Sequence, residues 1–298
     1  MSNIVRIFQV DAFTSTQFAG NPASVVLDAD GLTETQMRSI ARELNKGDTA
    51  FVLRPTADDH DIGIRFFSPV KEMPFVGHAT LAAHAVLARQ TPKTLRRQKG
   101  QTGIVEVHML PIGAGFSIRQ PAPTIGRTLA PAELDLVLPL LGLSREQLDP
   151  SCPARIAGAA STRLLLGVRE GAALDAIQPQ LPALGALSSQ LGAHGYFVFC
   201  RSTREAGCDT EARMFCPALG IDEDPVSGNA HAMLGVYLIE QGLLHASGAA
   251  ARFIGAQGMH MARPGRVAVQ VEVDAAGKAT AATIAGQAVV VFESEIRL

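Results

Sequence analysis

Three ionisable side chains stand close to glycines or turns in this sequence, in a pattern that suits proton transfer. His78 follows Gly77 directly. Asp224 lies four residues before Gly228, and Asp48 lies in a predicted turn. Burial and neighbouring charges bring the pKa values of carboxylates and histidines toward the working pH, so such groups can exchange protons with a bound molecule. The residue types therefore predict general acid–base chemistry at Asp48, His78 and Asp224.

The two glycines are also candidates for binding. Each precedes an apolar, helix-like segment, residues 79–88 in the first case and 230–239 in the second. Free N–H groups and the positive end of a helix dipole attract a carboxylate. Alternatively, the glycines only give the backbone the freedom to turn into each helix. Their duplication favours binding of a small acid or amino acid, with candidate residues Gly77, Ser227, Gly228 and Asn229.

An internal duplication is the most informative feature of the chain. Arg65–Pro69 (RFFSP) is followed by Pro74–Ala79 (PFVGHA), and Arg213–Pro217 (RMFCP) is followed by Pro225–Ala230 (PVSGNA). The two copies are separated by about half of the 298 residues. In each copy an apolar helix and then a strand-like alternating segment come next, at 103–109 and 266–273. The duplication predicts two similar half-domains about a pseudo-twofold axis.

The predicted elements favour one particular fold class. Strands are expected near residues 4–10, 23–27 and 49–54, and an amphipathic helix follows Thr33, whose hydroxyl is a candidate N-cap. The segment 79–88 is apolar on every face, so it should be a buried helix. A doubly wound sheet would place its helices outside with a polar stripe. We therefore expect an α/β (α+β) protein in which each half is a β-barrel-like sheet wrapped around a central apolar helix.

A proline-rich stretch, Gln120–Thr124, marks the expected domain boundary, because its prolines interrupt both helices and strand ladders. The predicted domains are residues 1–122 and 123–285. The C-terminal strand 286–298 is a candidate to complete the first of them. A ligand is expected in the cleft between the halves, where binding pockets are common.

Charge and composition exclude several classes of protein. Lys and Arg total 26 against 28 Asp and Glu, a net charge of -2, so nucleic acid is not an expected partner. The basic stretch Lys93–Lys99 is expected to be a solvated surface turn. No apolar stretch is long enough to span a membrane, and the N-terminus has no signal-like segment. These features predict a soluble cytoplasmic protein.

Cofactor motifs are absent, and the cysteines do not suggest a metal site. The chain has no phosphate-binding GxxxxGK[ST] loop, no strand-linked GxGxxG, no HExxH and no GxSxG. Its four cysteines form no CxxC pair and are expected to be reduced, structural thiols. We expect no metal and no organic cofactor. His84 is expected in the core, whereas His231 could face either the cleft or the core.

The motifs in combination resemble the PhzF family, named for an isomerase of phenazine biosynthesis, within the diaminopimelate epimerase-like fold. The resemblance spans nearly the whole chain. It rests on Gln9–Thr14 (QVDAFT), Gly20–Ala23 (GNPA), Arg42–Asn45 (RELN), Arg65–Pro69 (RFFSP), Pro74–Thr80 (PFVGHAT) and Glu223–Gly228 (EDPVSG). It implies two β-barrel-like halves around central helices, and a homodimer.

The resemblance also implies roles for individual residues. The family's acid–base glutamate falls on Asp48, its histidine on His78 and its aspartate on Asp224. The family's serine falls on Asn229, a second departure after Asp48. The implied activity is a cofactor-independent isomerisation of a small cyclic amino or carboxylic acid similar to trans-2,3-dihydro-3-hydroxyanthranilate. A binding protein of the same fold with impaired catalysis is the alternative.

Thiol-based racemases of the same superfold place a cysteine beside each helix start. Those places hold Val76 and Ser227 in this chain. Racemisation by two cysteines is therefore not expected, which leaves isomerisation through one carboxylate as the leading interpretation.

Overall fold

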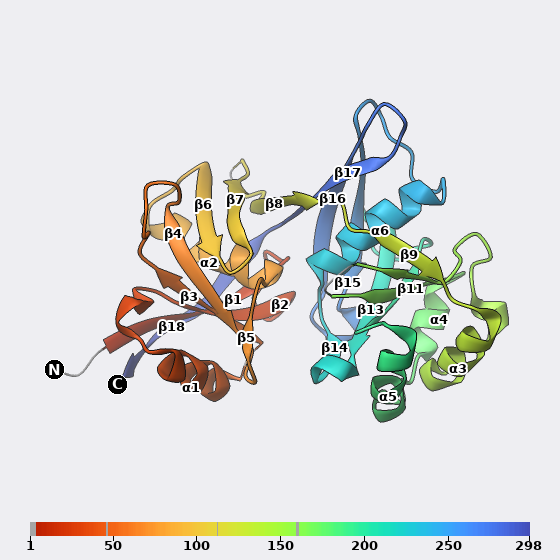
Figure 1. Cartoon of the computed structure of the whole chain (residues 1–298), viewed down its shortest axis with the longest axis horizontal. Coiled ribbons are helices and arrows are strands. Elements are labelled where there is room, and N and C mark those ends of the chain that lie inside the picture. Colours follow the sequence, from red (N-terminus) through yellow and green to blue (C-terminus); the bar gives the residue numbers. More distant parts are fainter. Residues whose placement is uncertain (1–3, 46, 112, 159–160) are drawn as a thin grey trace. The chain divides into compact units, whose positions relative to one another are not determined.

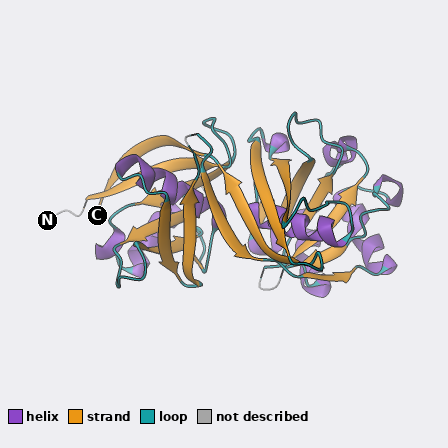
Figure 2. Ribbon diagram, turned by 90° about the horizontal axis from the view of Figure 1, so that it is seen from above, coloured by secondary structure: helices purple, strands orange, loops and turns teal. Residues whose placement is uncertain are grey.

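The computed structural model describes residues 4–45, 47–111, 113–158 and 161–298. The chain forms two compact units, coloured along the sequence in Figure 1. Unit 1 comprises Met1–Arg119 together with Ala285–Leu298, and unit 2 comprises Gln120–Ile284. Each unit is a mixture of strands and helices (Figure 2) and is described by itself.

Unit 1 contains two helices, and most of its remaining elements are strands. Its elements are β1 (Ile4–Ala12), β2 (Asn21–Val26), a 3-10 turn (Ala29–Gly31), α1 (Glu34–Leu44), β3 (Asp48–Leu53), β4 (Ile62–Phe67), β5 (Glu72–Met73), α2 (Gly77–Gln90), β6 (Leu95–Gly100), β7 (Gly103–Met109) and β18 (Ala288–Arg297). Strand β8 (Phe116–Pro121) crosses the boundary between the units, and the last two residues of β17 (Ala279–Gly286) also belong to unit 1.

Unit 2 has more helices. Its elements are β9 (Ile125–Thr128), α3 (Pro131–Leu141), β10 (Arg155–Ala157), β11 (Arg163–Val168), α4 (Gly171–Ala176), α5 (Leu181–Leu191), β12 (Tyr196–Cys200), β13 (Thr210–Cys216), β14 (Ile221–Asp224), α6 (Gly228–Glu240), β15 (Ala250–Gln257), β16 (Gly265–Val273) and β17 (Ala279–Gly286). Short 3-10 turns lie at Arg145–Gln147, Pro217–Leu219 and Met259–Met261.

The order of strand pairings is the same in the two units. In unit 1, β1 is antiparallel to β2, β2 is parallel to β3, β3 is antiparallel to β4, β4 is parallel to β6, and β6 is antiparallel to β7. In unit 2 the same alternation runs through β10, β11, β12, β13, β15 and β16. The duplication in the sequence is therefore a duplication of topology.

One apolar helix lies against the sheet in each unit. In unit 1, α2 contacts β1, β2, β3 and β18, and in unit 2, α6 contacts β9, β15 and β16. Ala79, Leu81, Ala82 and Ala83 of α2 are fully buried. The amphipathic α1 covers the other side of the unit 1 sheet, where Met37 and Ile40 pack with Phe51 and Phe67. Helices this apolar are stable only when sheet surrounds them.

One expectation from the sequence is wrong. The basic stretch Lys93–Lys99 is not a surface turn, because most of it belongs to strand β6, where Arg96 is 7% and Gln98 1% exposed. Side chains alternate between the two faces of a strand, so Arg97 and Lys99 face solvent. The run of charged residues conceals this alternation in the sequence. The guanidinium of Arg96 donates a hydrogen bond to the carbonyl of Thr91, at 2.9 Å.

Two other sequence expectations concern the membrane and the thiols. Within the described ranges no helix is long and apolar enough to cross a membrane. All four cysteines are free, and Cys152, Cys200 and Cys216 are buried.

Candidate active site

One candidate site lies at the start of α2 in unit 1. Val76 is the N-cap in extended conformation, and its carbonyl accepts hydrogen bonds from both the amide and the hydroxyl of Thr80, each at 2.9 Å. The first helical residues are Gly77 and His78. Their amides belong to the group of first-turn N–H groups that a helix leaves without internal partners.

Asp48 and His78 come together at this helix start. Asp48 is the first residue of β3 rather than a turn residue. Its Oδ2 lies 3.8 Å from Nε2 of His78, and the side chains are 20% and 15% exposed, respectively. That separation is too long for a direct hydrogen bond. Among the described residues, the buried Nε2 of His78 has no hydrogen-bond partner. The pair therefore presents a carboxylate and an unsatisfied imidazole nitrogen beside one another.

The protonation state of His78 follows from its burial. Desolvation lowers the pKa of His78 to about 4. His78 is therefore neutral at pH 7 and can form hydrogen bonds without adding a positive charge.

A second candidate helix start lies in unit 2, where β14 ends at Asp224 and α6 begins at Gly228. Ser227 is the N-cap, and its hydroxyl accepts a hydrogen bond from the amide of Ala230 at 3.3 Å. Asp224 is partly buried, Gly228 is buried and Asn229 is exposed. The chain thus places a carboxylate, a capped helix start and an exposed amide side chain within six residues.

A buried glutamine that the sequence analysis missed holds this segment in place. Gln257, at the end of β15, is 0% exposed. Its Oε1 accepts a hydrogen bond from the amide of Ser227 at 3.0 Å, and its Nε2 donates to the carbonyl of Asp224 at 2.6 Å. No motif identifies Gln257, because it is separated from Ser227 by 30 residues.

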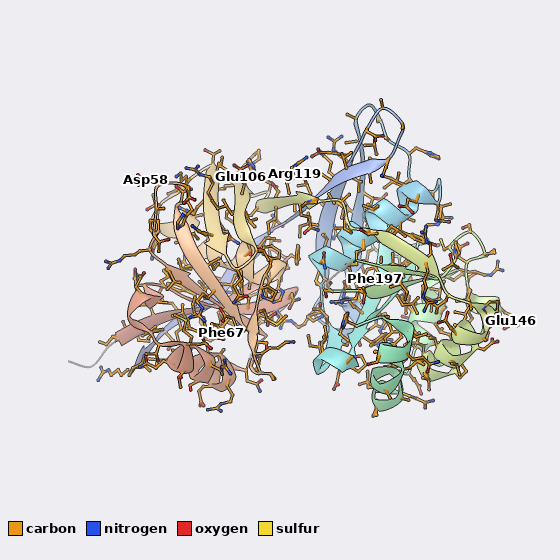
Figure 3. All side chains as sticks on the ribbon, in the orientation of Figure 1. Asp58, Phe67, Glu106, Arg119, Glu146 and Phe197 are labelled. Atoms are coloured by element: carbon orange, nitrogen blue, oxygen red, sulfur yellow. The ribbon has the colours of Figure 1, made fainter. Side chains whose placement is uncertain are left out.

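A repeated ion pair braces the strand that leads to each helix. In unit 1, Nε of Arg65 lies 2.7 Å from Glu72, and in unit 2, Nε of Arg213 lies 2.9 Å from Glu223. Each guanidinium also lies over an aromatic ring, Arg65 over Phe67 at 5.1 Å and Arg213 over Phe215 at 4.9 Å. The arginine in the repeated R-x-F-x-P motif therefore has a structural role. Phe67 is labelled in Figure 3.

The argument that Gly77 and Gly228 supply backbone freedom is not supported. Neither is among the residues with positive φ. A larger residue at these positions would therefore not be strained by φ.

Two further histidines belong to the core. His84 is 1% exposed and its Nε2 lies 3.0 Å from Oε1 of Gln98, as the sequence predicted. His231 is fully buried, with Nδ1 2.8 Å from the carbonyl of Ser227 and its ring edge-on to Phe197 (labelled in Figure 3). Burial lowers the pKa of both histidines to about 4. The question left open for His231 is therefore answered in favour of the core.

The thiols are not poised for reaction. Burial raises the pKa of Cys152 to about 11 and that of Cys216 to about 12. Val76 and Ser227, rather than cysteines, are the N-caps of α2 and α6. Within the described residues no group of three His, Cys, Asp or Glu side chains is placed to hold a metal ion.

The comparisons with known proteins concern the family and the fold of the chain. Residues 10–294 match the model of the PhzC-PhzF family, described as phenazine biosynthesis-like protein. The chain belongs to the PhzC-PhzF family. A Bacillus anthracis structure, a PhzF-family phenazine biosynthesis protein, has a TM-score of 0.89 and 28% identity, covering 99% of this chain and 100% of that one. The predicted family and fold class are thereby confirmed.

Two relatives of this PhzC-PhzF chain carry names that bear on activity. The uncharacterized isomerase YddE of Salmonella typhimurium is 36% identical over 294 residues, 97% of each chain. The trans-2,3-dihydro-3-hydroxyanthranilate isomerase of Pseudomonas chlororaphis is 34% identical over 239 residues, 78% of this chain and 79% of the relative. The protein is therefore an enzyme of the isomerase class, as the sequence predicted.

Proposed function

We propose that this chain is a cofactor-independent isomerase that moves a proton within a small cyclic amino or carboxylic acid of the trans-2,3-dihydro-3-hydroxyanthranilate type. The observation that carries the proposal is the Asp48–His78 pair at the start of α2, with 3.8 Å between Oδ2 and Nε2. The name of the Pseudomonas chlororaphis relative supports the substrate class.

The proposed reaction needs one carboxylate and no change of oxidation state. Asp48 removes a proton from one ring carbon, and the electrons of that C–H bond move into the adjacent double-bond system. Asp48 then returns the proton to a different carbon, so one C–H bond breaks and another forms while a double bond shifts. Neutral His78 supplies a hydrogen bond to the substrate, because its Nε2 is otherwise unsatisfied.

The substrate carboxylate would bind to the first-turn amides. Candidates are the N–H groups at Gly77, Gly228 and Asn229, where the helix dipole favours an anion. Asp224 and the neighbouring Ser227 would complete the contacts from unit 2. That both helix starts serve one ligand in a cleft between the halves stays a prediction from the duplication.

Isotope exchange tests the role of Asp48. The protein is incubated with trans-2,3-dihydro-3-hydroxyanthranilate in D₂O, and deuterium at carbon is followed by NMR. Asp48→Asn should lower the rate about 10²- to 10⁴-fold, the range that general acid–base groups supply. The exposed Asp58 (Figure 3) offers a matched control, Asp58→Asn, which should exchange like the wild type. Undiminished exchange in Asp48→Asn would remove Asp48 from the mechanism.

A second function is favoured by the two departures from the family pattern. Aspartate at position 48 is one methylene shorter than glutamate, and a displacement of about 1 Å can cost on the order of 100-fold in rate. Asn229 stands where the resemblance implies serine. A small-carboxylate-binding protein with impaired catalysis would bind such acids tightly in calorimetry without turnover. A large gain in the isomerisation rate in Asp48→Glu would indicate an enzyme that has recently lost its activity.

The other proposed properties concern partners and location. We expect a cytoplasmic homodimer whose partner is the small-molecule acid, with no nucleic acid and no membrane. Light scattering after gel filtration would measure the mass of the assembly, and a monomer at micromolar concentration would contradict the proposed dimer.

A further inference from the structure

Asp224 and Ser227 are three positions apart in the chain, as are the first and fourth residues of a β-turn, but the Ser227 amide bonds to Gln257 instead. In a common β-turn the carbonyl of the first residue accepts a hydrogen bond from the amide of the fourth. Here the amide group of Gln257 stands between these two groups, accepting from Ser227 at 3.0 Å and donating to Asp224 at 2.6 Å. The glutamine side chain therefore replaces the internal hydrogen bond of the turn and holds the turn open.

The residue after Gln257 brings the backbone close to the same turn. Gly258 has a φ of 92°, and a Cβ atom there would lie 2.8 Å from the carbonyl oxygen of Pro225 and 2.2 Å from that of Arg263. A side chain does not fit at this position, and L-residues rarely adopt its backbone conformation. Gln257 and Gly258 together thus form a close-fitting support beneath residues 224–227.

We propose that Gln257 is a positioning residue for the isomerisation, setting the separation between the Asp224 carboxylate and the amides at the start of α6. This inference rests on the proposed function. Gln257 satisfies the Ser227 amide, so the amides of Gly228 and Asn229 are the ones left for an anionic substrate group. Only a side chain that both donates and accepts can hold both backbone groups at once.

Loss of the side-chain amide of Gln257 should change the geometry of residues 224–227 more than the stability of the fold. In Gln257→Met, the Ser227 amide loses its acceptor, and closing the turn onto the Asp224 carbonyl would replace it. Closure would shift Asp224 relative to α6, for which we expect kcat to fall about 10- to 100-fold, the cost of a displacement near 1 Å. Stability would fall as well, since buried polar groups are disturbed.

A matched control separates these two effects. Tyr196 is fully buried in unit 2, and its hydroxyl donates to the carbonyl of Leu184 at 2.7 Å. Tyr196→Phe therefore removes a buried side-chain-to-backbone hydrogen bond in the same unit, away from residues 224–227. It should lower the melting temperature and keep the wild-type kcat. An equal fall in kcat in both variants would indicate that Gln257 has only a structural role.

A second variant supplies a readout that a purely structural role would not move. In Gln257→Glu, a protonated carboxyl group can accept from Ser227 and donate to Asp224, whereas a carboxylate can only accept. Burial raises the pKa of such a carboxyl group. We expect kcat near the wild-type value at low pH and a new loss of kcat as pH rises, measured from pH 5 to 9. A pH profile parallel to that of the wild type would overturn the proposal.

The two hydrogen bonds by which Gln257 holds Ser227 and Asp224, here called the clamp, can be tested without catalysis by amide hydrogen exchange. The Ser227 amide should be protected in the wild type and exchange faster in Gln257→Met than in Tyr196→Phe. If the wild-type chain turns over no substrate in D₂O, the proposed function fails, yet faster exchange of Ser227 would still support the clamp. Unchanged protection of Ser227 in Gln257→Met would overturn the clamp whatever the activity.

Discussion

At the scale of single residues, three buried histidines share the same change in pKa. The pKa of His78, His84 and His231 is lowered in each case to about 4 by desolvation. An unfolded chain titrates its histidines near pH 6.5. Between these values the unfolded state binds more protons than the folded state, so the stability present above pH 6.5 is lost as pH falls toward 4.

This difference in proton binding predicts that the stability of the protein depends on pH. Replacing a single buried histidine should make that dependence weaker. Each fully buried histidine should cost about 2 kcal/mol of unfolding free energy between pH 7.5 and pH 5. His84→Gln and His231→Gln should each show a smaller loss over that range than the wild type, measured by urea titration. His108 is an exposed histidine, so His108→Gln should lose as much as the wild type. Equal pH dependence in all four proteins would show that folding does not lower the pKa of the buried histidines.

At the scale of elements, each apolar helix is held by sheet and begins at a glycine that has no unusual backbone angle. The backbone conformation therefore does not require glycine at these two places. The helices themselves depend on core contacts further along, such as Ala82 and Ala83 of α2 in the unit 1 core. The helix start can accordingly be altered with limited effect on folding.

Because the helix starts lie apart from these core contacts, substitutions at the starts should weaken ligand binding while the protein stays folded. Gly77→Val and Gly228→Val should each weaken binding of anthranilate, a cyclic amino acid that cannot isomerise, at least about 10-fold, the scale of one lost charge-assisted contact. Calorimetry measures the affinity, and thermal unfolding checks the fold. Gln90→Val, at the exposed far end of α2, is the control and should bind normally. Near-normal affinity in either folded glycine variant would place the site away from that helix start.

At the scale of the whole molecule, the chain returns to its first unit at the end. Strand β18 pairs with β1 from Ile4–Arg297 to Ala12–Ala288, and β1 pairs with β2 on its other side. Unit 1 therefore depends on residues from both ends of the sequence, whereas unit 2 is continuous.

Deleting residues 286–298 should consequently destabilise unit 1 alone. The chain has no tryptophan and two tyrosines, Tyr196 and Tyr237, both in unit 2. Tyrosine fluorescence therefore reports on unit 2, while circular dichroism reports on both units. In the truncated chain we expect an early loss of ellipticity with the tyrosine transition unchanged, and deletion of Leu298 alone should have no effect. A tyrosine transition displaced as far as the ellipticity would contradict this prediction.

Much of the fold and part of the candidate site could be predicted from sequence because the signals are local. The repeated R-x-F-x-P and P-x-x-G motifs, with the apolar helix behind each, predicted the duplication and the central helices. Thr33 and Gln36 predicted the start of α1, where the capping box is present. Asp48, His78 and Asp224 were found by residue type and resemblance, and their catalytic roles stay predictions.

What only the tertiary structure decided depends on contacts between distant segments. The basic stretch 93–99 proved to contain a core strand because its neighbours β4 and β7 pair with it. The sequence left both core and cleft open for His231, and the contact of its ring with Phe197 places it in the core. Gln257 has no local signal, since its partners Asp224 and Ser227 reach it through the pairing of strands. Local patterns determine which segments become helix or strand, whereas the environment of a side chain is set by segments that fold beside it.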